Sequence, residues 1–231
     1  MRLSLSRPLA IDRSEVLRYL RSREDASLSD DLTAAADKIL TLAAPKAAAV
    51  VLPLCRQDDD QLVCGGLALP GTAIARHLEG CNQCMLLAVT LGFAVDRHIS
   101  IFGQSNPYQA LLLDACATTA IEDLADHATE QGRALLLSEP HAVTFRFSPG
   151  YGDLPLSLQP KLLELLDARR LLGLTVGSSL LLSPIKSVTA IIGIKDIGET
   201  TGTATTSLKT PGCANCTMAG HCPYSKTKTK G

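Results

Sequence analysis

Aromatic residues are scarce in this chain of 231 residues, which has no Trp and only four Phe and four Tyr. A core must therefore be built from Leu, Ile, Val and Ala, and the hydrophobic share of 46% is large enough to exclude wholesale disorder. An excess of positive charge is also lacking, since the formal net charge is −1. The sequence therefore argues against a protein that binds nucleic acid in a basic groove.

Long apolar runs are lacking as well. The longest, at about residues 47–55, is far shorter than the roughly 18 residues that a membrane-spanning helix needs. The first nine residues carry Arg2 and Arg7 without an apolar stretch, which does not fit a signal peptide. We expect a cytoplasmic protein without membrane contact, so its eight cysteines are ligands, redox groups or buried thiols rather than a disulfide framework.

Helical and strand patterns follow one another without a steady β-α-β rhythm, which favours an α+β fold over a doubly wound sheet. The composition changes near Asp196, because residues 197–211 are mostly Gly, Thr and Ser. Three cysteines and a lysine-rich end follow. We therefore predict one α+β domain over residues 1–196, with a Gly/Thr linker and a cysteine-bearing tail over 197–231.

Several elements are predicted with specific ends. A strand at 47–54 should lie at a sheet edge or end at Pro53, because proline donates no ladder hydrogen bond. A buried strand is predicted at 84–91, and a long helix should begin at Tyr108, with Gly132 as a possible break. Another helix is predicted over 158–172.

The segment from Arg146 to Asp153, Arg-Phe-Ser-Pro-Gly-Tyr-Gly-Asp, combines three groups suited to an amphoteric ligand. Arg146 offers a planar fork for a carboxylate. Gly150 permits close approach to the backbone, and Tyr151 offers a ring face to a base or a sulfonium. The residues alone leave a second interpretation open, namely a tight turn with a surface arginine.

This segment resembles the Arg-x-x-x-Gly-Tyr motif in the activation domain of cobalamin-dependent methionine synthase. Four other stretches resemble that family in the same order along most of the chain, which makes the resemblance more specific than one motif. They are 11–20, 86–92 followed by Asp96, 120–126, and the run 174–188 that ends in Pro-x-x-Ser-Val. The resemblance implies a bent, mostly antiparallel sheet with flanking helices, in a short, free-standing form of the domain.

The resemblance also implies a function. Members of the family bind S-adenosylmethionine, whose methyl group restores methylcobalamin after an electron donor has reduced cob(II)alamin. By the same resemblance, the ligand would contact Arg146, Ser148, Gly150 and Tyr151, with Arg146 on the methionine carboxylate. No general acid or base is needed, so no catalytic residue is assigned.

Two departures from the family bear on this expectation. Aromatic residues of the full-length synthases are replaced here by Ile191-Ile-Gly-Ile-Lys195. The chain also has no room for homocysteine, folate and cobalamin modules. We therefore expect a methionine synthase component, without turnover alone, that acts on a separate cobalamin-carrying polypeptide with a flavodoxin- or ferredoxin-type electron donor.

The tail carries a second candidate site. Cys213 and Cys216 form a C-x-x-C pair, and Cys222, followed by a proline, lies six residues further on. Three thiolates at this spacing predict a zinc or iron–sulfur site, with a thiol–disulfide relay or an inert tail as alternatives. Cys84, from the second C-x-x-C pair with Cys81, could add a ligand or be a buried thiol.

Two rival functions follow from these residues. One is a metal or iron–sulfur redox protein that acts on a corrinoid protein without binding S-adenosylmethionine, and the other is a non-catalytic docking module. Two groups of side chains receive structural interpretations only. Glu122, Asp123 and Asp126 are expected on the wet face of a helix, and His77 is expected at the surface or partly packed.

Overall fold

The computed structural model of the protein describes residues 1–22, 26–57, 61–137 and 141–196. One antiparallel sheet has the order β4-β3-β2-β5-β9-β6, and β1 also pairs with β2. Its strands are β1 (Arg2–Leu3), β2 (Lys46–Arg56), β3 (Leu62–Cys64), β4 (Leu67–Leu69), β5 (Gln83–Thr90), β6 (His141–Val143) and β9 (Ser187–Asp196). A separate hairpin joins β7 (Thr175–Val176) to β8 (Leu182–Ser183). This architecture confirms the predicted α+β class with a mostly antiparallel sheet.

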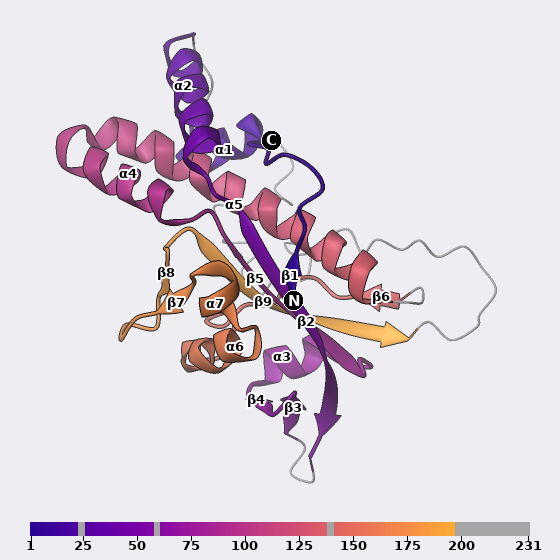
Figure 1. Ribbon diagram of the computed structural model, residues 1–231. Coiled ribbons are helices and arrows are strands. Elements are labelled where there is room, and N and C mark those ends of the chain that lie inside the picture. The colour runs from indigo at the N-terminus through magenta and orange to yellow at the C-terminus, as the bar shows by residue number, and fades with distance from the viewer. Residues whose placement is uncertain (23–25, 58–60, 138–140, 197–231) are drawn as a thin grey trace.

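Helices flank the sheet on both sides, and the long helix α5 runs diagonally across it in Figure 1. The helices form two groups, one on each side of the sheet, and each group packs its apolar side chains into its own core cluster. The first group is α1 (Arg13–Leu20), α2 (Ala26–Leu42), α4 (Phe93–Ser105) and α5 (Pro107–Leu136). The second is α3 (Thr72–His77), α6 (Gln159–Leu165) and α7 (Ala168–Leu172), preceded by a short 3-10 turn at Leu156–Leu158.

The central strand β5 is apolar on both faces because helices cover both. Met85 and Leu87 face the α5 side, whereas Cys84 and Leu86 face the α6 side, and all four are fully buried. Each buried aliphatic side chain of this size contributes about 1.5–3 kcal/mol. The buried strand predicted at 84–91 is confirmed, and its continuous apolar run follows from this double covering.

The prediction for Pro53 was wrong. β2 continues to Arg56 and lies inside the sheet, between β5 and β3. Pro53 stands where β2 changes partner, because Leu52 and Pro53 pair with β5 while Leu54 begins the pairing with β3. Its carbonyl accepts a hydrogen bond from the Gly65 N–H, 3.3 Å away. The missing proline donor is tolerated at this change of partner.

Two helix predictions also need correction. α5 runs through Gly132, where an added Cβ would lie 2.7 Å from the Met85 sulfur, so the glycine permits close packing of helix on sheet rather than breaking the helix. The helix predicted over 158–172 is divided into α6 and α7 by Asp167, whose φ of 49° is left-handed. This turn lets both short helices bury leucines in one cluster, Leu162 from the first and Leu172 from the second.

Within the described residues, no helix is both long and apolar enough to cross a membrane. The predicted linker and tail over 197–231 lie outside the described residues.

The close approach at Gly193 in β9 gives a first prediction. An added Cβ there would lie 2.5 Å from the Cys81 sulfur and 2.9 Å from Leu78. We expect Gly193→Ala to lower the free energy of unfolding by about 1–3 kcal/mol. Gly103→Ala is the control, since a Cβ there has no neighbour within 4 Å, and it should raise stability by roughly 0.5–1 kcal/mol. Urea denaturation measures both, and equal effects would contradict the packing at Gly193.

Candidate functional site

The Arg146–Asp153 loop leaves the sheet at β6 and is held to β9 on the way. The Thr144 N–H donates to the Gly193 carbonyl at 2.9 Å, and Phe147 and Ile191 exchange two backbone hydrogen bonds of 3.0 and 2.8 Å. Phe147 is buried in the core cluster on the α6 side. Arg146 precedes it, and its side chain is therefore directed to the opposite face, toward α5.

Two tight turns shape the loop after this pairing. The Gly150 N–H donates to the Leu154 carbonyl at 2.7 Å, and the Tyr151 N–H donates to the Ser148 carbonyl at 3.0 Å. Gly150 has a φ of +88°, which a residue with a side chain adopts only at a cost, and it is exposed. Because Gly150 carries no side chain, its exposed backbone can be approached closely.

Asp153 ties the loop to the start of α3. Its carboxylate accepts hydrogen bonds from the Thr72 N–H at 2.6 Å and from the Ala73 N–H at 3.1 Å. The hydrogen bond from the Thr72 backbone lowers the pKa of Asp153 below its ordinary value. The loop is thus fixed at one end to β9 and at the other to α3.

Arg146 is held by two carboxylates of α5. Its guanidinium donates to Glu122 at 2.7 Å and also to Asp126. Glu122 and Asp126 lie four residues apart and therefore share one helix face. Both acids lie on a solvated helix face, as expected, with side chains 47% and 71% exposed, and they also bind the arginine of the loop, which the sequence did not predict. The i, i+4 spacing was visible in the sequence, but nothing there showed that Arg146 would face α5.

On the opposite face, aromatic rings follow one another beneath the loop. The Tyr151 ring is 62% exposed and contacts Phe147 edge-on, with ring centroids 5.9 Å apart. Phe147 in turn lies 5.0 Å from the His77 ring, and His77 lies 4.3 Å from Phe145. Arg146 and Tyr151 thus flank the loop from two sides, with Gly150 and Ser148 in the turn between them.

His77 is partly buried at the end of α3, as expected. One ring nitrogen, Nε2, is hydrogen-bonded to the Thr144 hydroxyl at 2.8 Å, and the same hydroxyl accepts the Gly193 N–H. Burial lowers the pKa of His77 from 6.5 to about 4. The imidazole is therefore neutral at pH 7. It contacts the segment that follows β6 from the side opposite Arg146.

Two buried cysteines adjoin this region. Cys84 and Cys64 lie in the same core cluster, and the sulfur contact between them raises the pKa of Cys84. Among the described residues no group of three or more His, Cys, Asp or Glu could hold a metal ion. The predicted ligands Cys213, Cys216 and Cys222 lie outside the residues that the structure describes.

Comparison with solved structures connects this geometry with a known fold. A crystal structure of the MetH reactivation domain bound to AdoHcy matches with a TM-score of 0.58 and 18% sequence identity. The match covers 80% of this chain and 70% of the other. The chain has the reactivation-domain fold. The sequence itself matches no protein-family profile and no curated protein. The family resemblance read from the motifs is thus confirmed at the level of the fold.

The buried imidazole of this reactivation-domain fold gives a second prediction. The unfolded state binds a proton on His77 below about pH 6.5, whereas the folded state does so only below about pH 4. The contribution of His77 to the free energy of unfolding is therefore fully present above pH 6.5, and it is lost progressively as the pH falls toward 4. We expect the free energy of unfolding to fall less in His77→Phe than in wild type between pH 7 and 4.5.

Urea denaturation at several pH values measures this difference. His98→Phe is the control, because His98 is much less buried and its replacement should leave the pH dependence close to that of wild type. Parallel pH profiles for wild type and His77→Phe would show that the imidazole is not held neutral.

Proposed function

We propose that this protein binds S-adenosylmethionine on the Arg146–Asp153 loop and supports reductive methylation of cobalamin carried by a separate methionine synthase polypeptide. The observation that carries the proposal is the Arg146, Gly150 and Tyr151 arrangement on a loop pinned at both ends, within the reactivation-domain fold. The matched structure binds AdoHcy, which is S-adenosylmethionine without the transferred methyl group.

Arg146 is the proposed partner of the methionine carboxylate. Its present partners are solvent-accessible, because the side chains of Glu122 and Asp126 are 47% and 71% exposed. Ion pairs of such exposed acids contribute about 1 kcal/mol or less. A ligand carboxylate that accepts a bidentate pair of hydrogen bonds from the guanidinium can replace them. The two released acids would then stand close to the positive ammonium of the same ligand.

The rest of the loop has the features that a bound nucleoside needs. Gly150 exposes its backbone, Ser148 lies in the same turn, and Tyr151 is 62% exposed. A ring face attracts both an adenine base and a sulfonium. Tyr151 rests on the buried Phe147, so the aromatic surface is supported from below.

The chemistry itself would belong to the cobalamin of the partner. An electron from a flavodoxin- or ferredoxin-type donor reduces cob(II)alamin, and the reduced cobalt takes the methyl group as the carbon–sulfur bond breaks. This chain would hold the sulfonium in line with the metal, and orientation of two reacting centres lowers a barrier substantially. We therefore propose a component of the synthase that has no turnover alone.

A second candidate function rests on Cys213, Cys216 and Cys222. The three cysteines would bind zinc or an iron–sulfur cluster and carry electrons to a corrinoid protein, without S-adenosylmethionine. Metal analysis and absorbance of anaerobically purified protein separate the two functions. A bound cluster without heat of S-adenosylmethionine binding would favour this redox protein.

Calorimetry with S-adenosylmethionine provides the third prediction. Loss of a charge-assisted hydrogen bond to a carboxylate costs about 1.5–3 kcal/mol, so Arg146→Ala should bind roughly 10- to 150-fold more weakly than wild type. Arg146→Lys keeps the charge but lacks the planar fork, and it should bind with intermediate affinity.

Arg7→Ala is the matched control, because Arg7 also forms a two-bonded ion pair with an acid of α5, Asp123. It should bind S-adenosylmethionine as wild type does. Equal affinities of Arg146→Ala and wild type would reject the carboxylate contact. A wild-type protein that binds S-adenosylmethionine but does not accelerate methylcobalamin formation in the partner would reject the reactivation role.

A further inference from the structure

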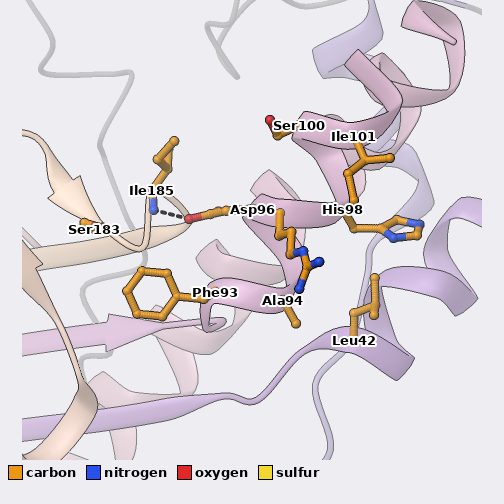
Figure 2. Close-up of a pocket in the computed structure, with 10 residues that line it drawn as sticks. Leu42, Phe93, Ala94, Asp96, His98, Ser100, Ile101, Ser183 and Ile185 are labelled. Carbon is orange, nitrogen blue, oxygen red and sulfur yellow. Dashed lines mark hydrogen bonds between the residues drawn. The ribbon is translucent and has the colours of Figure 1, made fainter. Parts of the chain in front are cut away.

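An apolar groove of about 890 Å³ lies between α4, the end of α2 and the turn from β8 to β9. Figure 2 shows Phe93 and Ile185 at one end and Leu42 with Ile101 at the other. Phe93 and Ile185 are 58% and 73% exposed, which is high for large apolar side chains that line the same groove. Contiguous apolar surface that is exposed to water is typical of sites that bind another protein, a membrane or a ligand.

The groove is built rigidly at its centre. The Asp96 carboxylate accepts a hydrogen bond from the backbone N–H of Ile185, as Figure 2 shows. It also accepts one from the backbone N–H of Lys186 at 3.1 Å. These bonds join the first turn of α4 to the start of β9. The groove therefore keeps its shape without an occupant, and its one acid is already committed to the backbone.

The charge beside the groove is positive. Arg97 lines the groove, and Lys38 lies one helical turn before Leu42 on α2. Burial lowers the pKa of His98, and the charge of Lys38 adds to this shift. Both cations are exposed, and neither is hydrogen-bonded or ion-paired to any of the residues that the structure describes. An occupant should thus offer apolar side chains along the groove and a carboxylate to Arg97 or Lys38.

Two other possible occupants, the end of this chain and a second copy of it, do not complement the positive charge beside the groove. The lysine-rich end of the chain, with Lys226, Lys228 and Lys230, has the same sign as the groove cations. A second copy packed groove to groove about a two-fold axis would bring like charges together. A separate, acidic partner is therefore favoured.

We propose that this groove docks an apolar, carboxylate-bearing segment of the cobalamin-carrying polypeptide. The inference rests on the proposed function for the identity of the partner. The groove lies beyond the start of β9, since Ile185 is two residues before the strand, whereas the loop pairs with Ile191 in the middle of the strand. Docking there would hold the partner without covering Arg146 or Tyr151.

Interferometry with the purified cobalamin-carrying methionine synthase polypeptide tests the docking and is our fourth prediction. The double variant Phe93→Ser with Ile185→Ser should weaken binding by at least about 10-fold, as expected for two large apolar contacts. Arg97→Glu should also weaken it and should reduce the dependence on salt, whereas Arg97→Lys should not. Leu135→Ser, which changes an exposed apolar residue at the far end of α5, should bind as wild type does.

Three results would overturn the docking site. The groove variants could bind the polypeptide as tightly as wild type, wild type could fail to bind it, or the same variants could abolish self-association or binding to vesicles of anionic phospholipid instead. Calorimetry with S-adenosylmethionine on the same variants keeps the two proposals apart. Unchanged ligand affinity with weakened partner binding supports docking, whereas absent ligand binding in wild type rejects the proposed function only.

Discussion

The backbone pairing of Phe147 with Ile191 decides where the functional groups of this protein lie. It places one side chain in the core and thereby turns its neighbour, Arg146, toward α5. The same pairing supports the Tyr151 ring through the buried Phe147. Without it, nothing would hold the middle of the segment between the Thr144 contacts and Asp153, and the arginine and tyrosine would not be fixed on opposite sides of the loop. Pre-organisation of this kind limits the entropy that a ligand must overcome on binding.

Electrostatics gives the loop its second property. The arginine is held in place by acids that remain in water, so it is oriented at low cost and can exchange partners. On the other face, His77 is neutral and partly buried, and it connects α3 to β9 and to the segment after β6 through the Thr144 hydroxyl. One face of the loop therefore carries exchangeable charge and the other carries fixed aromatic packing. This division suits a ligand with a zwitterionic end and an aromatic end.

Much of this was visible in the sequence, and the rest was not for physical reasons. The unbroken apolar run at 84–91 predicted the buried strand β5. Five motifs in the same order as in the family indicated the fold that the structure shows. The predictions at Gly132 and Pro53 were wrong because tertiary contacts override the usual local effect of each residue. Gly132 packs against Met85, and Pro53 lies where β2 changes its strand partner. The role of Glu122 and Asp126 depends on which face of the sheet Arg146 occupies after β6, and no local pattern encodes that.

The apolar groove illustrates the same limit. Phe93, Leu42 and Ile185 come from three separate segments, and only the fold brings them to one surface.

A crystal structure of this protein with S-adenosylhomocysteine would show the proposed contacts themselves. We expect the carboxylate of the ligand to be hydrogen-bonded to the Arg146 guanidinium in place of Glu122 or Asp126, with Gly150 and Tyr151 against the nucleoside. A ligand seated elsewhere, with Arg146 still paired to both acids of α5, would contradict this expectation.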